Sequence, residues 1–246
     1  LVERNIINGK AIPVRMSAVS HENGPPTVGE TPLRSDAERN RDRIVAAARS
    51  VFARDGLSAS MASVARQADV GIATLFRRFP SKDELIEAVF ADRMDAYLEA
   101  VATALAEPDP WRGFTHYIET VCGMQAADLG FAGVLTMTFP MATVLEARRR
   151  EAYDGLVQLA ERAKAAGCLR EDFTPEDMVL LLMANAGVVA ATADAAPTAW
   201  RRVVALLTQA LQAPARDALP SPPEPSALYE AMIRLASTAG SRQLAR

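Results

Sequence analysis

The sequence predicts an all-α protein in which a small N-terminal head precedes a larger helical body. Apolar residues recur at the three-to-four spacing of a buried helix stripe through most of the chain. The chain is 50% hydrophobic but only 6% aromatic, and its many alanines and leucines favour packed helices over strands. It shows no βαβ alternation and no run of alternating β-branched residues. We therefore expect a bundle of about nine to ten helices.

Residues 1–34 contain four prolines and three glycines and lack hydrophobic periodicity, so we expect a disordered N-terminal extension. Met16 offers an alternative start, which would place residues 1–15 outside the native protein, and N-terminal sequencing would decide this. Order is expected to begin at Ser35, because Ser35-Asp36-Ala37-Glu38 has the spacing of a capping box. This box predicts a first helix over residues 36–54.

The centre of the head is the segment from residue 60 to residue 82, which contains two short helical patterns. Ser60 is a favourable N-cap for the first pattern, and Asp69-Val70-Gly71 separates it from the second. The second pattern covers residues 71–78, and Pro80 forbids its continuation. Two helices joined by so tight a turn cross steeply, as in a helix-turn-helix. The second helix is then free to lie in a DNA major groove, which is about 12 Å wide.

A long helix is predicted to join the head to the body. Ser81-Lys82-Asp83-Glu84 has the pattern of a second capping box, and the apolar stripe after it continues to Glu107. A helix of about 25 residues is roughly 37 Å long at 1.5 Å per residue. Because this length exceeds that of a three-helix head, the helix must reach a second layer of structure.

The elements of the body are predicted from caps and helix breakers. Asp109-Pro110 and Thr174-Pro175 each place a capping residue before a proline at the first helical position. The expected elements are a helix from Pro110, a short irregular helix within residues 127–139, long helices over 141–166 and 175–193, a long helix from Pro197, a linker over 214–225 and a short helix over 226–237. The helix over 175–193 is apolar nearly all round, which predicts burial on every side.

Charge is unevenly distributed along the chain. Between Ser35 and Lys82 there are nine basic and five acidic residues, a surplus of +4. Because the net charge of the whole chain is −3, the remainder carries −7. A basic module attached to an acidic body is typical of a DNA reader, although an ordinary charged helix surface produces the same surplus.

Several classes of site are disfavoured. Cys122 and Cys168 lie far apart without CxxC spacing, so we expect no disulfide framework and a reducing, cytoplasmic setting. His21 and His116 are not at metal-ligand spacing from a cysteine, so no metal and no cofactor are predicted. His116 has no carboxylate and second histidine at helical spacing, so no catalytic residue is assigned. The most apolar run, residues 178–193, is shorter than the about 20 residues of a membrane span.

The stretch from Arg43 to Leu85 resembles the DNA-binding head of the TetR/AcrR family of transcriptional regulators. The resemblance rests on three runs, IVAAARSVFARDG, SMASVARQADV and GIATLFRRFPSKDEL, of which the last is the most specific. It implies a homodimeric repressor that leaves a palindromic operator in double-stranded DNA when a small apolar effector binds the body. The implied domains are the extension over 1–34, the head over 35–82, a ligand-binding and dimerisation domain over 83–213, and a proline-rich linker and tail over 214–246.

Within the head the resemblance implies DNA contacts residue by residue. Ser60 and Lys82 take the places of phosphate-contacting residues, and the second short helix faces the groove. The implied DNA-binding residues are Ser60, Met61, Gly71, Ile72, Ala73, Thr74, Phe76, Arg77, Arg78 and Lys82. Phe76 stands where the family usually has tyrosine, and Asp69 where it commonly has a turn glycine. Ile72 is better suited to a thymine methyl than to guanine.

The body contains bulky or pliable side chains on helices that must face one another, a pattern that fits a ligand chamber or a plain core. The candidate ligand-binding residues are Trp111, Phe114, Tyr117, Ile118, Met124, Phe131, Met137, Phe139, Met141, Met183 and Asn185. Asn185 lies in an apolar helix and needs hydrogen-bond partners, which a ligand, a dimer mate or neighbouring backbone would supply.

Other interpretations of the same residues stay open. Arg77 and Arg78 also fit a solvated helix face, and Ile72 also fits a core position. Lys82 also fits the second position of a capping box, but lysine is electrostatically unfavourable at a helix N-terminus, so a phosphate partner would explain it. The main alternative function is a non-catalytic helical ligand-binding or adaptor protein. An all-α enzyme is a weaker alternative, and the sequence does not separate a repressor from an activator.

Overall fold

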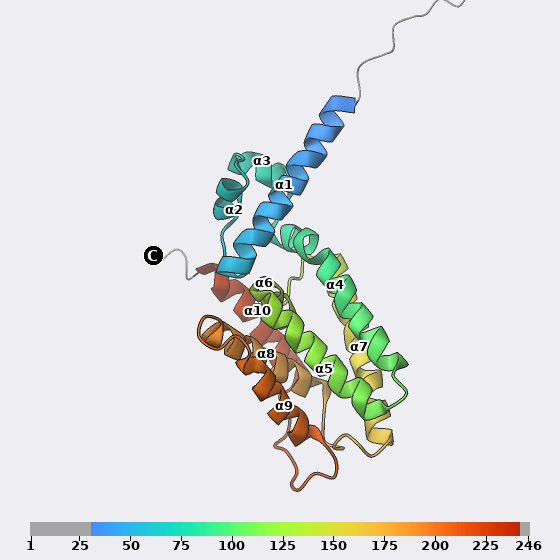
Figure 1. The fold of residues 1–246 in the computed structure, drawn as a ribbon. Coiled ribbons are helices and arrows are strands. Elements are labelled where there is room, and N and C mark those ends of the chain that lie inside the picture. Colours follow the sequence, from blue (N-terminus) through green and yellow to red (C-terminus); the bar gives the residue numbers. More distant parts are fainter. Residues whose placement is uncertain (1–30, 242–246) are drawn as a thin grey trace, which may run out of the picture.

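The structure, a computed structural model, describes residues 31–241, with side chains described for residues 38–235. The described part consists of ten α-helices without a strand: α1 Thr31–Asp55, α2 Met61–Gln67, α3 Ile72–Arg78, α4 Lys82–Ala106, α5 Pro110–Ala127, α6 Leu129–Thr136, α7 Thr143–Ala165, α8 Pro175–Thr192, α9 Ala199–Leu211 and α10 Pro225–Ser241. The first three helices form a head at one end, and the others form the body (Figure 1). This confirms the predicted all-α fold with its long fourth helix.

Most helices begin at the capping residues that the sequence predicts. The Ser60 and Ser81 side chains each accept a hydrogen bond, at 3.1 Å, from the backbone N–H three residues further on. Asp109 accepts from two backbone N–H groups in the first turn of α5. Thr174 and Asp177 form a reciprocal capping box at the start of α8. These bonds satisfy donors that a helix start would otherwise leave free.

The start of α1 differs from the prediction. The helix begins at Thr31, so the tetrad from Ser35 to Glu38 lies inside it and is not a cap. The proline next to Thr31, Pro32, falls in the first turn, where a missing N–H is tolerated, so nothing in the sequence stops the helix from starting early. The rest of the predicted disordered extension, residues 1–30, lies outside the described residues.

The prediction that α8 is buried on every side is wrong for the protomer. Only 28% of its 18-residue apolar window is buried, because α8 packs on α5, α6 and α9 and leaves another face uncovered. By length and composition α8 is also the single described helix that could cross a membrane. An apolar helix with an uncovered face needs a further partner to bury that face.

The turn between α2 and α3 has the geometry of a Schellman motif. The N–H of Val70 donates to the carbonyl of Ala65 at 3.0 Å, and the N–H of Asp69 donates to the carbonyl of Arg66 at 3.2 Å. Asp69 adopts a positive φ of 52°, which aspartate tolerates better than most residues. The aspartate that replaces the common glycine therefore still closes the helix-turn-helix.

One hydrophobic core runs from the head into the body along α4. Phe90 of α4 stacks on Phe52 of α1 with ring centroids 6.2 Å apart, and it contacts Phe131 of α6 at 6.1 Å. Further along α4, the Tyr97 ring stacks on Tyr117 of α5, and the two hydroxyls share a buried hydrogen bond of 3.0 Å. The same helix therefore packs against both the head and the body within this one core.

Gly155 permits the close approach of α4 and α7. A Cβ atom at this position would lie 2.1 Å from a γ-methyl of Val101, which is 5% exposed on α4. Valine is stiff at χ1 and cannot swing that methyl away cheaply. The absence of a side chain at Gly155 is therefore a packing requirement.

We predict that Gly155→Ala lowers the free energy of unfolding by about 1–3 kcal/mol, because overpacking outweighs the gain in helix propensity. Urea denaturation measures this. Gly123→Ala in α5 is the control, since its new Cβ would contact the Trp200 ring at an ordinary 3.4 Å. Equal stability of the Gly155 and Gly123 variants would contradict the packing argument.

Candidate functional site

The third helix presents an exposed face that carries both apolar and basic side chains. Ile72 and Phe76 are each 44% exposed, and Ala73 and Arg77 beside them are also exposed. On the other side of the helix, Leu75 is fully buried in the head core. Such a face suits a partner that offers both apolar groups and anions, as a DNA groove does.

The cations around this face are electrostatically uncompensated. Within the described residues, Arg66, Arg77, Arg78 and Lys82 have no acidic partner within ion-pair distance, whereas Arg54 pairs with its neighbour Asp55 at 2.8 Å. Lys82 is half-buried, and burial lowers the pKa of its ammonium group while the Asp83 carboxylate opposes this shift. A half-buried lysine at a helix N-terminus is costly, and a bound phosphate would stabilise it.

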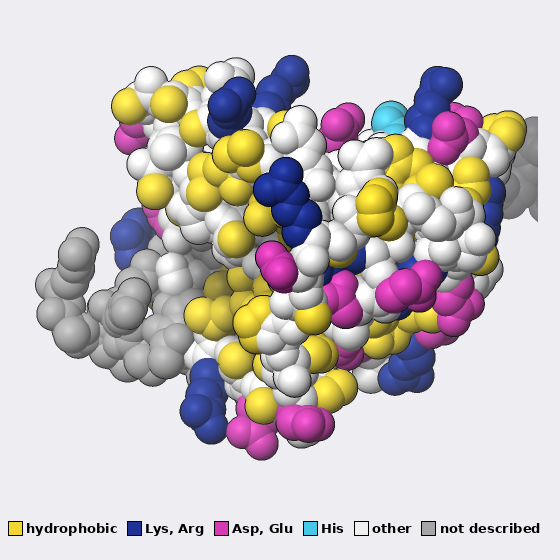
Figure 2. Space-filling model, turned by 90° about the horizontal axis from the view of Figure 1, so that it is seen from below, with side chains coloured by type: hydrophobic (Ala, Val, Ile, Leu, Met, Phe, Trp, Pro, Cys, Tyr) yellow, Lys and Arg dark blue, Asp and Glu magenta, His cyan; other side chains and the backbone are white. Residues whose placement is uncertain are grey.

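All of the residues implied as DNA contacts are exposed or partly exposed on the surface of the head. Exposed members are Ser60, Gly71, Ile72, Ala73, Phe76, Arg77 and Arg78, and half-buried members are Met61, Thr74 and Lys82. The individual DNA contacts of these head residues stay predictions. At the end of the molecule opposite the head, acidic and basic side chains are interspersed on the surface (Figure 2).

Most of the candidate ligand-binding residues pack in the core of the body. Fully or nearly buried members are Phe114, Tyr117, Ile118, Phe131, Phe139 and Asn185, partly buried members are Trp111, Met124, Met137 and Met183, and Met141 is 70% exposed. Phe114 contacts Phe173 edge-on at 5.4 Å, a contact typical of a packed core. None of the set lines the cavity of about 730 Å³ between α7, α8 and α10, so their role as ligand contacts stays a prediction.

Asn185 obtains its partners from α5. Its amide donates to the carbonyl of Cys122 at 3.2 Å and to the side-chain oxygen of Gln125 at 2.8 Å. Gln125, also fully buried, donates in turn to the carbonyl of Leu182 at 3.2 Å. Neighbouring backbone and a buried glutamine therefore satisfy the Asn185 side-chain NH2 group and tie α8 to α5, whereas the buried Oδ1 oxygen of Asn185 has no hydrogen-bond partner among the described residues. Sequence reasoning missed Gln125, because a long-range partner leaves no local pattern.

A large cavity, which we call the α10 cavity, lies between α7, α8 and α10 and has a volume of about 730 Å³. Its walls include Arg149 and Tyr153 of α7, Val179 of α8, and Tyr229 and Met232 of α10. This size is typical of small-molecule sites, which measure about 300–1,000 Å³. Sequence reasoning did not single out these residues, because the Arg148–Arg150 run looks like a solvated helix face.

Two charged side chains of the α10 cavity hold the connection between α6 and α7. The Arg149 guanidinium donates to the carbonyls of Val134 and Met137, and its own pKa is lowered chiefly by burial. The Glu146 carboxylate accepts from the N–H of Phe139 at 2.8 Å. Groups that line the cavity thus also fix the backbone next to it.

The same connection reaches the start of α4. The N–H of Met141 donates to the Asp83 carboxylate at 3.3 Å, next to Lys82. Thr138 and Pro140 line the α10 cavity and also a smaller cleft of about 200 Å³ beside Lys82. We call this second space the junction cleft. The cavity and the head are therefore separated by one hydrogen-bonded segment.

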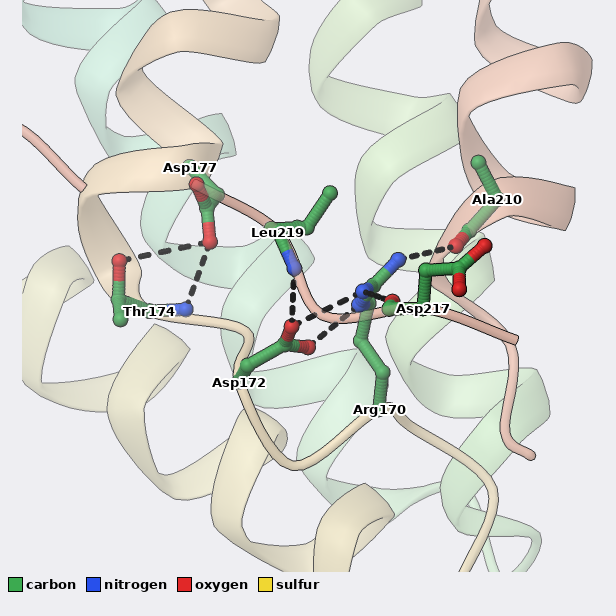
Figure 3. Close-up of polar contacts among 7 residues, drawn as sticks. All are labelled: Arg170, Asp172, Thr174, Asp177, Ala210, Asp217 and Leu219. Atoms are coloured by element: carbon green, nitrogen blue, oxygen red, sulfur yellow. Dashed lines mark hydrogen bonds and ion pairs between the residues drawn. The ribbon is translucent and has the colours of Figure 1, made fainter. Parts of the chain in front are cut away.

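The chain that leads into α10 is anchored by a polar cluster (Figure 3). Arg170, only 7% exposed, donates through two nitrogens to the Asp172 carboxylate and also donates to the carbonyls of Ala210 and Asp217. Asp172 accepts from the N–H of Leu219 at 2.8 Å. These hydrogen bonds hold the pKa of the Asp172 carboxyl below its usual range, with the Arg170 guanidinium as the main cause. The start of the linker is thus fixed to the body.

Two family profiles match the chain in tandem. Residues 44–89 match the bacterial regulatory proteins of the tetR family, and residues 109–213 match the C-terminal domain of SbtR-like transcriptional regulators. The chain belongs to the TetR family. It is therefore a DNA-binding transcriptional regulator with a ligand-binding C-terminal domain, and regulators of this family are not enzymes.

Solved structures of TetR regulators are similar to this chain. A TetR transcriptional regulator from Streptomyces coelicolor is 30% identical over 71% of this chain and 99% of its own, with a TM-score of 0.45. PfmR from Thermus thermophilus is 19% identical over 68% of this chain and 98% of its own, and FadR from Bacillus subtilis in complex with stearoyl-CoA is 16% identical over 68% and 96%, each with a TM-score of 0.52. The last two show the shared fold. Comparison with curated proteins gave no match.

We predict that Arg149→Met lowers the free energy of unfolding by about 2–3 kcal/mol, because two carbonyls lose their donor inside the protein. Urea denaturation at neutral pH measures the loss. The matched control is Arg150→Met, since the exposed Arg150 forms no ion pair within the described residues and its loss should cost less than about 0.5 kcal/mol. Similar values for both variants would contradict the assigned role of Arg149.

Proposed function

We propose that this TetR regulator is a cytoplasmic homodimeric repressor that binds a palindromic operator and leaves it when an effector occupies the body. The observation that carries the proposal is the exposed face of α3, where Ile72, Phe76 and Arg77 lie together and the basic residues lack acidic partners within the described chain. A helix with this face fits a major groove, and its positive charge favours phosphates.

Within the proposed complex, the side chains divide into base-reading and phosphate-binding groups. Arg77 would donate to guanine, and Ile72 would contact a thymine methyl. Ser60 and Lys82 flank α3 and would bind phosphates, which fixes the helix in the groove without reading sequence. Phe76 has no hydroxyl and contributes apolar contact only. Two heads about 34 Å apart would read the two halves of the palindrome.

We place the dimer interface on the uncovered face of α8 together with α9. Leu180, Ala184, Gly187 and Ala191 are all exposed and recur at helical spacing along one stripe of α8. Leu206 of α9 is 54% exposed. Small residues along such a stripe let a second helix approach closely, and a two-fold axis would pair each stripe with its copy. The proposed four-helix interface would bury the apolar face that the protomer leaves open.

The effector is proposed to be a small, largely apolar molecule that binds in the α10 cavity. Support comes from the volume of the cavity and from its hydrogen-bonded link, through residues 137–141, to the start of α4. An effector that binds more tightly to one arrangement of the heads shifts the population toward that arrangement. Release follows if that arrangement no longer matches the spacing of the operator.

Selection of bound duplexes from a randomised pool, followed by fluorescence anisotropy, tests the DNA-binding proposal. We expect an inverted repeat to be enriched. Arg77→Ala should weaken binding to it by about 1–3 kcal/mol and relax one base position, and Lys82→Ala should lower the slope of log affinity against log salt by about 1. Arg112→Ala, at the far end of α4 and α5, is the control. Failure to enrich any sequence, or equal losses for all three variants, would contradict the proposal.

The dimer is tested by sedimentation velocity at micromolar concentration. The wild-type protein should sediment at twice the protomer mass, and Leu206→Glu should shift it to the protomer because it places a charge in an apolar interface. Val144→Glu serves as the control, since this side chain is 50% exposed at the start of α7 and lines a cleft with residues of α1 and α4. A wild-type monomer, or a dimer that survives Leu206→Glu, would argue against the interface.

A further inference from the structure

The tenth helix forms one wall of the α10 cavity, and most side chains in its described part, residues 225–235, are exposed. Of its described residues, 225–235, only Leu228 and Met232 are buried, with exposures of 8% and 6%. Tyr229 also lines the cavity but is 47% exposed. The linker before α10 is anchored at Arg170, whereas residues 225–235 of α10 bury only these two side chains, with Ile233 partly buried. A helix held in this way opens more readily than the core.

Beneath α10 a small inner chamber of about 80 Å³ adjoins the cavity. Tyr153, Val179 and Met232 line both spaces and separate them, so a shift of these side chains would join the two. The other walls of the inner chamber are mostly apolar: Leu135, Leu156, Met178 and Leu182, with Tyr97 beside them. Its volume is below the roughly 150 Å³ of a cavity that holds benzene. The end of an unbranched chain therefore fits the chamber better than a ring.

Polar groups gather in the outer part of the cavity. Thr143, Glu146, Arg150 and Glu176 line only this outer part, and Arg149 stands where the two spaces meet. Acidic and basic groups are balanced, so this end offers hydrogen bonds to a polar group without a net charge of one sign. The two spaces together present an apolar interior and a polar mouth.

We propose that the effector is a straight-chain molecule with one polar end, bound in the α10 cavity with its chain in the inner chamber, and that α10 is the cover that moves to admit it. This inference rests on the proposed function, because it names the ligand class and the entrance of the same effector site. Met232 is the central residue, since it lines both spaces and is one of two buried side chains that hold α10 in place.

The test uses the full-length, DNA-free protein with decanoate and 1-decanol as probes and 1-naphthoate as a ring-shaped comparator. Calorimetry should show saturable binding of at least one straight-chain probe, about tenfold tighter than that of naphthoate. Met232→Trp fills the inner chamber and should weaken probe binding by about tenfold or more. Ser226→Trp is the matched control, because Ser226 is exposed on α10 and lines neither space. Val179→Trp, which fills the chamber from α8, replaces Met232→Trp if that variant fails to fold.

Hydrogen exchange with and without the probe tests the cover. Exchange in residues 225–235 should be faster than in α5 without the probe and about tenfold slower when the probe binds, because a probe in contact with Met232 stabilises the closed cover. Binding of decanoate alone or decanol alone supports the proposal and identifies the polar end as charged or neutral. Four results would overturn the proposal. Neither decanoate nor 1-decanol binds, or naphthoate binds as tightly as they do. Alternatively, the tryptophan variants bind the probes as well as the wild type does, or the exchange of α10 does not change. If the protein binds no operator, the proposed function is contradicted, but the results for probe binding and for the exchange of α10 still test this inference.

Discussion

The structure depends on α4 packing against the head and the body at once, within one continuous core. Near its start, Phe90 packs between Phe52 of the head and Phe131 of the body, and further on Tyr97 packs and hydrogen-bonds with Tyr117. A stiff helix shared by both parts leaves the head no independent orientation. Any rearrangement of the body that moves α4 must therefore move the recognition helix α3 as well.

Two elements connect the α10 cavity to the start of α4: the segment of residues 137–141 and the helix α10. Residues 137–141 are held from the cavity side by Arg149 and Glu146 and from the head side by Asp83. Ile233 of α10 lines the junction cleft together with Leu57, so α10 runs from the cavity to the base of the head, as Figure 1 also shows. A ligand under α10 would act on two elements that already contact the start of α4.

Local chemistry allowed much of this fold to be predicted, and long-range contacts account for the rest. Caps such as Ser81 and Asp109 act within one helical turn, so their residue types suffice to place helix starts. The capping-box pattern at Ser35 gave the wrong helix start, because the residues before it also adopt helical backbone and α1 begins at Thr31. Apolar periodicity predicted that α8 is buried, but it could not show that one face of the helix is exposed in the protomer. The α10 cavity was missed because Arg149 and Met232, far apart in sequence, meet only in the folded chain.

The proposed coupling between body and head is tested most directly by the distance between the two heads of the proposed dimer. Gln67, exposed at the end of α2, accepts a spin label as cysteine once Cys168 is replaced by serine. Cys122 stays unlabelled because burial raises the pKa of its thiol to about 12. Double electron–electron resonance should give one narrow distance on operator DNA and a shifted distribution when decanoate fills the cavity. Identical distributions in the two states, with DNA nevertheless released, would contradict a mechanism in which α4 carries the signal.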